Sequence, residues 1–356
     1  PTALHLAALV AWNRNDFPAA GEMIRTCLAL QPGHRGAMDL LILMDPHNSG
    51  AERRPETIGK IEKLRKRKGK ISIGIHTRSD KEADPQLRLL WGDHWVKQEL
   101  EKELSRLGFE PGRGNPDINL HLFGSPARDL DEQALNLVWL HSHPDMVTVE
   151  NLRQFDRIFC ASSHFLPKLR AMGYVSPELM PACTSKTPVQ TSIEYDMVFL
   201  GNARASRADG RAIVGDMMST GLDFKVWGNL WERIVPKANY GGRYWEYERL
   251  EELYARARIT LNDHHPDMER EGFVSNKVFD ILASGGFVIS GKNKGLAPLF
   301  EDSVPEYESS GHLKELAEHF LDHPEERRRL MEKGREIARG HTYAERAAQF
   351  TRELLR

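Results

Sequence analysis

The spacing of apolar positions divides the chain into regions with different predicted structures. In the first 45 residues, apolar and small side chains recur every three or four positions, which is the period of a helix. These positions are Leu4, Ala7, Ala8, Ala11, Phe17, Ala20, Ile24 and Cys27. From Ile71 onward, short β-branched runs alternate with amphipathic stretches. Such alternation predicts a parallel sheet with helices on both faces.

Residues 1–45 predict a helical hairpin whose helices touch through small residues. The stretch "NDFPAAGEMIRTCLALQP" resembles the second helix of a tetratricopeptide repeat, with a proline closing the unit. One repeat cannot bury its face alone, so it packs on the next domain or further repeats precede Pro1, where the sequence begins without methionine. We expect a further helix over 36–44. A plain hairpin without repeat ancestry is the alternative.

Residues 46–69 are dominated by charge and predict a linker. The basic run from Lys60 to Lys70 is typical of a solvated helix face. Contact with phosphate or with an anionic membrane is the alternative.

The alternating part of the chain predicts two α/β halves of similar size. In the first, over 70–190, the runs "ISIGIHT", "DINLHLFGSP" and "LNLVWLHSHPD" predict strands. A polar linker over 184–196 separates it from the second half, over 191–335, where "MVFLGN", "DFKVWGN" and "RITLND" predict strands again. A charged helical region follows, and residues 336–356 form its last helix.

Composition narrows the function. The 356 residues are enough for about two domains, and the net charge is −2, from 49 basic and 51 acidic residues. A nucleic-acid binder would show a basic excess. The three scattered cysteines form neither a disulfide framework nor a zinc site, so a reducing compartment is expected. No apolar run reaches the ~18–20 residues of a membrane span, and no signal peptide is found. We expect a cytoplasmic protein.

The stretch "LNDHHPDMEREGFVSNKVFDILASGGFVIS", over 261–290, concentrates the candidate chemistry. It predicts a strand, a loop, a helix that begins after Ser275, a glycine turn and a second strand. Ligands of open parallel sheets bind at the carboxyl ends of the strands. The free N–H groups of the helix start and Lys277 suit an anion, and Asp280, one turn later, suits a ribose diol. Phosphate plus ribose indicates a nucleotide. An exposed pair of Lys277 and Asp280 is the alternative.

This stretch resembles the donor-binding segment of GT-B glycosyltransferases, and it is closest to the CgeB-like, or spore-maturation-protein-like, group. Asp280 stands five residues before Gly285, as the helix acid of the family does, although that acid is usually glutamate. Glu271 stands nine residues before Asp280 rather than the commoner eight, so the resemblance assigns it no role. The resemblance implies two Rossmann-like doubly wound domains that face a cleft. It also implies that Asp280 binds the ribose and Lys277 the diphosphate.

Other segments match the same family. "WGDHWVKQELEKELSRLGFE" resembles the opening of the acceptor domain, "MVFLGNARASR" the first strand and loop of the donor domain, and "HTYAERAAQFTREL" the closing helix that crosses back to the first domain. The implied function is metal-independent, hexosyltransferase-type transfer in bacterial glycan biosynthesis. The candidate donor-binding residues are Asn202, Arg204, Arg207, Asn262, His264, Gly272, Ser275, Asn276, Lys277 and Asp280.

An inverting reaction needs a base that takes the proton of the acceptor. Histidine suits this task because its pKa lies near neutrality. The candidates for catalysis, at predicted strand ends and helix starts, are His94, His141, His143 and Asp145. In a retaining reaction the same histidines would only bind the transferred sugar. The sequence leaves the stereochemistry, the sugar, the base and the acceptor open.

We expect a nucleotide sugar and a glycan or protein acceptor as partners, with no metal or other cofactor. The repeat is expected to recruit a protein or to mediate self-association. One alternative is an inactive interaction protein, and another is a nucleotide-sugar epimerase on the same fold. A metal-dependent hydrolase, suggested by His141 and His143, is disfavoured because the chain divides into two sheets rather than one barrel.

Overall fold

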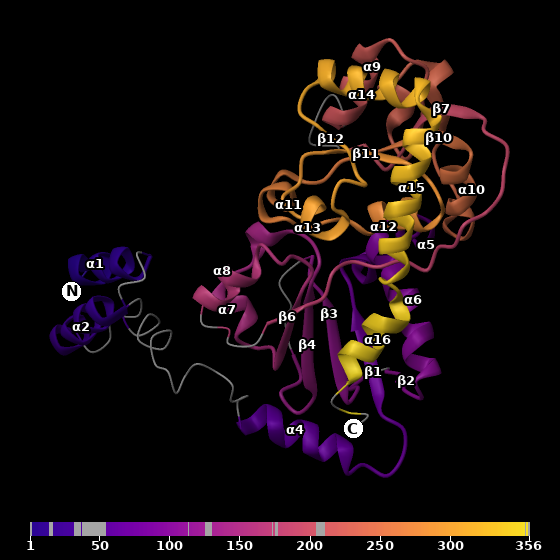
Figure 1. Ribbon diagram of the computed structural model, residues 1–356. Helices are drawn as coiled ribbons and strands as arrows, with labels where there is room; N and C mark the ends of the chain where they lie inside the picture. Colours follow the sequence, from indigo (N-terminus) through magenta and orange to yellow (C-terminus); the bar gives the residue numbers. More distant parts are fainter. Residues whose placement is uncertain are drawn as a thin grey trace.

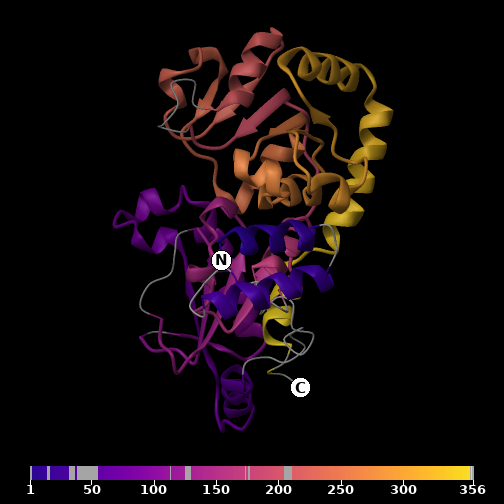
Figure 2. The ribbon, with the colours of Figure 1, turned by 90° about the vertical axis from the view of Figure 1, so that its left-hand side faces the viewer.

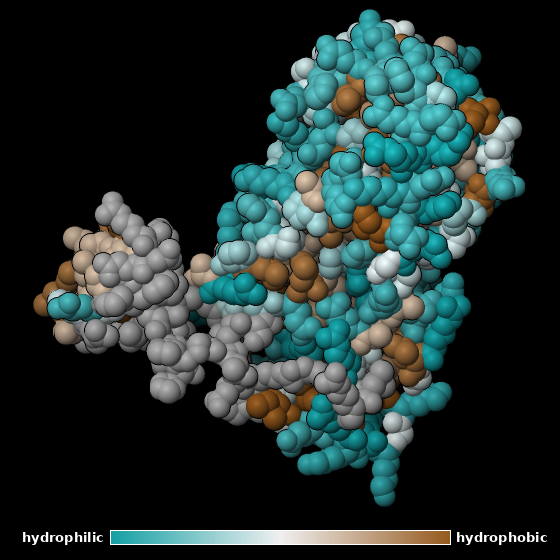
Figure 3. Space-filling model, viewed as in Figure 1, coloured by the Kyte–Doolittle hydropathy of each residue, from teal (hydrophilic) through white to brown (hydrophobic). Residues whose placement is uncertain are grey.

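The computed structural model describes residues 2–13, 17–31, 37, 55–112, 114–124, 130–172, 174, 177–203, 211–352 and 354. Two α/β domains lie one above the other, and two helices near the N-terminus form a separate hairpin (Figures 1 and 2). The surface that faces the viewer in Figure 3 is mostly hydrophilic, with small hydrophobic patches. Within the described parts of the chain, no helix is long and apolar enough to cross a membrane.

The first domain contains a parallel sheet with the strand order β2-β1-β3-β4-β5-β6. All six residues of β4 are buried, as expected for a central strand covered on both faces. The strands are β1 (Ser72–His76), β2 (Glu110–Pro111), β3 (Ile118–Leu122), β4 (Leu135–Leu140), β5 (Arg157–Cys160) and β6 (Glu178–Leu179). The α-helices are α5 (Pro85–Arg88), α6 (Gly92–Arg106), α7 (Val149–Leu152) and α8 (Leu166–Ala171).

The second domain repeats this plan with the order β12-β11-β10-β7-β8-β9, also parallel. The strands are β7 (Tyr195–Leu200), β8 (Lys225–Trp227), β9 (Tyr240–Gly242), β10 (Ala257–Asn262), β11 (Val288–Gly291) and β12 (Glu306–Tyr307). The α-helices are α9 (Ala212–Thr220), α10 (Leu250–Ala255), α11 (Pro266–Glu271), α12 (Asn276–Ala283), α13 (Leu296–Phe300), α14 (Ser310–Asp322) and α15 (Pro324–Arg339). The chain order reverses between β7 and β10, and ligands bind at such a switch point.

The chain crosses between the domains twice. A segment without regular helix or strand, 180–194, leads from the first domain to the second, and the last two residues of the predicted linker over 184–196 belong to β7. Residues 340–342 lead back from α15 to α16 (Tyr343–Thr351). The last helix was predicted to begin at residue 336, so it begins a few residues later than expected. Thr184 pairs with Thr342 where the two crossings meet. Figure 1 shows α16 beside α6, and its Tyr343, Ala347 and Phe350 complete the core of the first domain.

At the N-terminal end, α1 (Thr2–Asn13) and α2 (Phe17–Leu30) form the expected hairpin, with Ala8, Ile24 and Cys27 buried between them. Its repeat ancestry stays a prediction. The expected helix over 36–44 lies outside the described residues, except for Ala37.

Part of the predicted linker is helical. In α4 (Pro55–Arg65), Ile61 and Leu64 are buried in the core of the first domain. The Lys60 ammonium pairs with Asp156 at 2.8 Å, so charge also holds α4 on the domain.

Candidate active site

Two adjoining pockets open into the cleft between the domains. The first, of about 310 Å³, is walled by aromatic side chains of both domains, and we call it the aromatic pocket. The second, of about 330 Å³, is lined by His141, His143, His264 and His265, and we call it the histidine pocket. Both pockets share Gly92, Val96, Arg211, Asn276 and Lys277, which therefore mark their junction.

Two helices begin at this junction, one from each domain. Helix α6 starts at Gly92 and α12 at Asn276. The first N–H groups of a helix lack partners within the helix, and its dipole makes this end electropositive. The Lys277 ammonium lies 4.6 Å from the centroid of the Phe199 ring, and the Arg211 guanidinium lies 5.6 Å from it. The junction therefore suits a polyanion.

Arg211 is fixed in place by two further contacts. Its Nη1 lies 2.6 Å from Asp263 Oδ1, and its Nε donates to the Asn202 carbonyl at 2.7 Å. These contacts hold the guanidinium beside the carboxyl ends of β7 and β10.

Asp280 lines the aromatic pocket from α12. Its Oδ1 accepts a hydrogen bond of 2.6 Å from the Thr184 hydroxyl on the first crossing. Burial raises the pKa of Asp280 to about 7, although the Thr184 hydrogen bond and the Lys186 charge oppose this rise. The carboxylate lies near the carboxylates of Glu99 and Glu251, which raise its pKa further.

The aromatic wall is continuous across the cleft. The Trp95 ring on α6 stacks on the Tyr247 ring of the second domain, with centroids 4.4 Å apart and planes 6° apart. Trp91, Tyr244 and Trp245 line the same pocket. Aromatic faces beside a buried carboxylate suit a nucleoside, because the base stacks and the ribose diol donates hydrogen bonds.

The loop before α12 is held by a buried network. Ser275 N–H donates to His264 Nε2 at 3.1 Å, so this nitrogen carries no proton, and burial lowers the pKa of His264 to about 3. The Asn262 amide donates to the Ser290 hydroxyl at 3.0 Å. Ser275 and His264 line the histidine pocket, whereas Asn262 is fully buried behind it.

Gly272 ends α11 with φ 71°, a left-handed conformation that favours glycine. A Cβ there would lie 3.1 Å from the Ser162 hydroxyl and 3.1 Å from the His164 side chain, both in the first domain. Gly272 therefore allows the close approach of the two domains rather than contact with a ligand.

Glu271 lines neither pocket and joins the two domains. The Lys168 ammonium on α8 pairs with its carboxylate at 2.7 Å, and the Ser162 hydroxyl donates to its carbonyl at 2.6 Å. Burial alone would raise the pKa of Glu271, but hydrogen bonds and charge from Lys168 and Arg270 lower it below its usual value. Asp145 forms a similar interdomain ion pair, with Arg270, and lines neither pocket.

Of the other candidates for catalysis, His141 and His143 line the histidine pocket and His94 lines neither pocket. The Nδ1 of His141 lies 3.4 Å from the Trp139 carbonyl, and burial lowers the pKa of His141. The His143 ring lies 5.1 Å from the His265 ring of the other domain. The pKa of His94 is lowered, first by burial and then by the Arg88 charge.

The predicted phosphate contacts in the first loop of the second domain are only partly described. Asn202 lines the aromatic pocket, and its amide donates to the Leu90 carbonyl across the cleft at 3.1 Å. Its Oδ1 accepts the Asn229 N–H at 2.9 Å. Arg204 and Arg207 lie outside the described residues.

Asp93 and Arg211 are among the pocket residues that the sequence did not single out. Asp93 lines the histidine pocket from the first turn of α6, next to His94, which the sequence favoured as a histidine at a predicted helix start. Its Oδ2 accepts the Ser79 N–H at 3.1 Å, and its Oδ1 is buried without a hydrogen-bond partner among the described residues. Arg211 was missed because no motif marks it.

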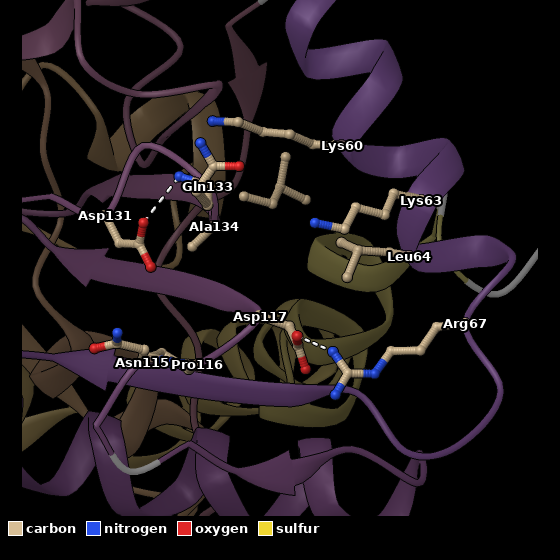
Figure 4. A pocket seen from close by; sticks show the side chains of 11 residues that line it. Lys60, Lys63, Leu64, Arg67, Asn115, Pro116, Asp117, Asp131, Gln133 and Ala134 are labelled. Atoms are coloured by element: carbon tan, nitrogen blue, oxygen red, sulfur yellow. Dashed lines mark hydrogen bonds and ion pairs between the residues drawn. The ribbon is translucent and has the colours of Figure 1, made fainter.

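A further pocket, of about 380 Å³, lies at the opposite edge of the first sheet (Figure 4). Asp117 and Ala134 line it just before β3 and β4, so it adjoins the amino ends of these strands. Figure 4 shows Lys63 pointing into it from α4 and Arg67 paired with Asp117. This pocket is therefore separate from the cleft. The expectation that the basic run from Lys60 to Lys70 forms a solvated helix face stays a prediction.

Comparison with known proteins identifies the class of the fold. Residues 207–352 match a family model described as glycosyl transferase-like. No curated protein sequence matches the chain. The matched residues include α9 to α15 of the second domain and α16.

Solved structures are similar over most of the chain. Sucrose-phosphate synthase from Thermosynechococcus elongatus has a TM-score of 0.58 and 12% identity, over 80% of this chain and 99% of its own. T4 phage BGT in complex with UDP and Mn²⁺ has a TM-score of 0.53 and 12% identity, over 80% and 99%. A glycosyltransferase from Rickettsia africae has a TM-score of 0.54 and 10% identity, over 82% and 100%. The two domains thus have the expected GT-B fold, whereas the CgeB-like assignment stays a prediction.

Proposed function

We propose that the protein transfers a sugar from a nucleotide diphosphate donor to an acceptor in the cleft. The observation that carries this proposal is the junction, where two helix N-termini, Lys277 and Arg211 lie between an aromatic and a histidine pocket. The nucleoside binds in the aromatic pocket with its ribose on Asp280, and the diphosphate binds at the junction. The transferred sugar and the acceptor meet in the histidine pocket.

The chemistry follows from this arrangement. The difficult event in glycosyl transfer is the departure of a diphosphate on which negative charge develops. Fixed N–H groups and cations that face this charge stabilise the transition state, and such electrostatic stabilisation often contributes more to catalysis than any other effect. Because cations of the chain already face the junction, we expect transfer to be independent of metal.

The finer assignments are part of the same proposal. We expect a hexosyltransferase of bacterial glycan biosynthesis that acts in the cytoplasm on a glycan or protein acceptor. The hairpin of α1 and α2 would recruit a protein acceptor or mediate self-association, since a single hairpin leaves apolar side chains such as Leu6 and Val10 exposed.

A calorimetric panel of UDP, GDP, dTDP, CMP and ADP, with magnesium and then with EDTA, tests the proposal. We expect one diphosphate to bind, with the same affinity in both buffers. Lys277→Ala and Arg211→Ala should each weaken this binding about tenfold or more, because each removes a charge-assisted contact of ~1.5–3 kcal/mol. Lys292→Ala is the matched control, since Lys292 lies in the same domain outside both pockets.

Two other results would point away from transfer. Failure of all five nucleotides to bind would favour an interaction protein. Conversion of the bound nucleotide sugar to its epimer, seen by NMR without any acceptor, would favour the epimerase.

A further inference from the structure

Among the described residues, three aspartates line the two pockets, and their carboxylate oxygens differ in their hydrogen-bond and ion-pair partners. Asp280 accepts the Thr184 hydroxyl at 2.6 Å, and Asp263 pairs with Arg211 at 2.6 Å. Asp93 also has a partner on one oxygen, since its Oδ2 accepts the Ser79 N–H at 3.1 Å, but it differs from the other two in its second oxygen. Its Oδ1 is buried and accepts no hydrogen bond from the described residues.

An unpaired buried carboxylate oxygen is costly. Leaving a buried polar group without a partner costs ~1–3 kcal/mol, and more when the group is charged. Such groups are rare in folded proteins and call for an explanation. A ligand hydroxyl that donates to Asp93 when the site is filled would remove this cost.

The position of Asp93 identifies that hydroxyl. Asp93 follows Gly92, which lies at the junction where the diphosphate would bind, and it lines only the histidine pocket. It belongs to the first domain, whereas Lys277, Arg211 and Asp280 belong to the second. The acid therefore faces the sugar and acceptor from the domain opposite the nucleotide.

We propose that Asp93 is the base that accepts the proton of the acceptor hydroxyl, and that transfer inverts the anomeric configuration. This proposal rests on the proposed function. The acceptor oxygen forms a bond to the anomeric carbon while the bond from that carbon to the diphosphate oxygen breaks. The electron pair leaves with the diphosphate, and the acceptor proton moves to Asp93.

The other acids of the region do not suit a retaining double displacement, which needs a carboxylate nucleophile beside the sugar. Asp263 lines the histidine pocket but is held by Arg211. Glu271 lines neither pocket and pairs with Lys168. Burial lowers the pKa of His141, although the nearby Asp93 charge opposes this change. His141 is therefore neutral near pH 7, and a neutral imidazole is suited to bind a sugar hydroxyl.

Donor hydrolysis tests the inference with water as the acceptor. The probe is the α-hexose donor of whichever nucleotide the panel selects, UDP-α-D-glucose in the case of UDP. Proton NMR within the first minutes, before mutarotation, should show the β anomer of the released sugar. First release of the α anomer would overturn the proposal.

Substitutions distinguish the role of Asp93 from the roles of neighbouring residues. Asp93→Asn should slow hydrolysis by about 100-fold to 10,000-fold, the usual contribution of a general base, while nucleotide affinity stays within about threefold. Formate should partly restore the rate of Asp93→Ala. Glu103→Gln, also on α6 but outside both cleft pockets, is the matched control.

Two outcomes count against Asp93. A wild-type rate in Asp93→Asn would remove Asp93 from catalysis, and loss of rate only in His141→Gln would move the role to His141. A wild-type protein that binds no nucleotide would instead overturn the proposed function itself, so the two failures are distinguishable.

Discussion

We expect Asp280 to make nucleotide binding depend on pH. Burial raises the pKa of Asp280 to about 7, and a ribose diol donates hydrogen bonds best to the ionised carboxylate. We expect nucleotide affinity to rise with pH through 7 and to fall by up to about tenfold per unit below it. Calorimetry between pH 5.5 and 8.5 measures this. Asp280→Asn should bind weakly at every pH, and a wild-type profile in this variant would remove Asp280 from the ribose site.

The same carboxyl makes stability depend on pH. Its pKa is raised from 3.8 to about 7, so the native protein holds this proton more tightly than the unfolded chain does. The contribution of Asp280 to the free energy of unfolding therefore falls as pH rises from about 4 to about 7. Asp280→Asn removes this effect, and its melting temperature should exceed that of the wild type at pH 8. A melting temperature of the variant below that of the wild type would mean that ionisation of the buried Asp280 carboxylate does not destabilise the fold.

Single residues were predictable where local pattern decides their role. The helix start and the glycine turn single out Lys277 and Asp280, and both line the aromatic pocket, whereas Gly272, predicted to bind the donor, lines neither pocket. Asp93 and Arg211 were not predictable, because their positions depend on segments that are distant in the sequence: Asp93 shares the histidine pocket with His264, and Arg211 pairs with Asp263. Nor does sequence reveal that His264 accepts a hydrogen bond from Ser275 and holds the loop.

Helix α12 is bound to both crossings between the domains. The Asn276 amide donates to the Cys183 carbonyl at 2.8 Å and to the Tyr343 hydroxyl at 3.2 Å. Thr184 donates to Asp280, and its hydroxyl accepts the Lys186 N–H at 2.9 Å. The helix that would hold the donor is therefore fastened to the segments that connect the two domains.

Thr184→Val tests this connection. It removes a hydrogen bond that lowers the pKa of Asp280, so this pKa should rise further and the pH midpoint of nucleotide binding should move upward. Thr184→Ser keeps the hydroxyl and should behave as the wild type. A loss of affinity that is equal at every pH would mean that Thr184 has only a structural role.

Among the elements, the long strands were predictable and most of the short ones were not. Buried runs such as β4 are unmistakable, whereas β2, β6, β9 and β12 have only two or three residues each and are defined by their neighbours. Helix α4 was not predictable as part of the first domain, because its charges hide the spacing of Ile61 and Leu64.

At the scale of the whole molecule, contacts close the cleft at two places. Lys168 and Ser162 bind Glu271 at one, and Asn202 binds the Leu90 carbonyl at the other, beside the stack of Trp95 on Tyr247. The two halves and their linker were predictable from the alternating pattern. These contacts were not, because they join surfaces that are unrelated in sequence.

Lys168→Glu should break the interdomain contact at Glu271 and open the cleft there. It sets a negative charge against the buried Glu271, which lines neither pocket, so nucleotide affinity should change little. Small-angle scattering should show a larger radius of gyration, and donor turnover should fall. Arg170→Glu makes the same charge change on an exposed residue of α8 and is the control. Equal radii for the two variants would mean that the ion pair does not hold the domains together.

The return of α16 to the first domain determines the order in which the protein matures on the ribosome. Tyr343, Ala347 and Phe350 fill the core of a domain whose other members are synthesised far earlier. At ~5–20 residues per second, the first domain waits about 10 to 30 s for these side chains, the time in which the second domain is synthesised. The half made first is thus finished last, and during that interval its unfilled groove is open to chaperones.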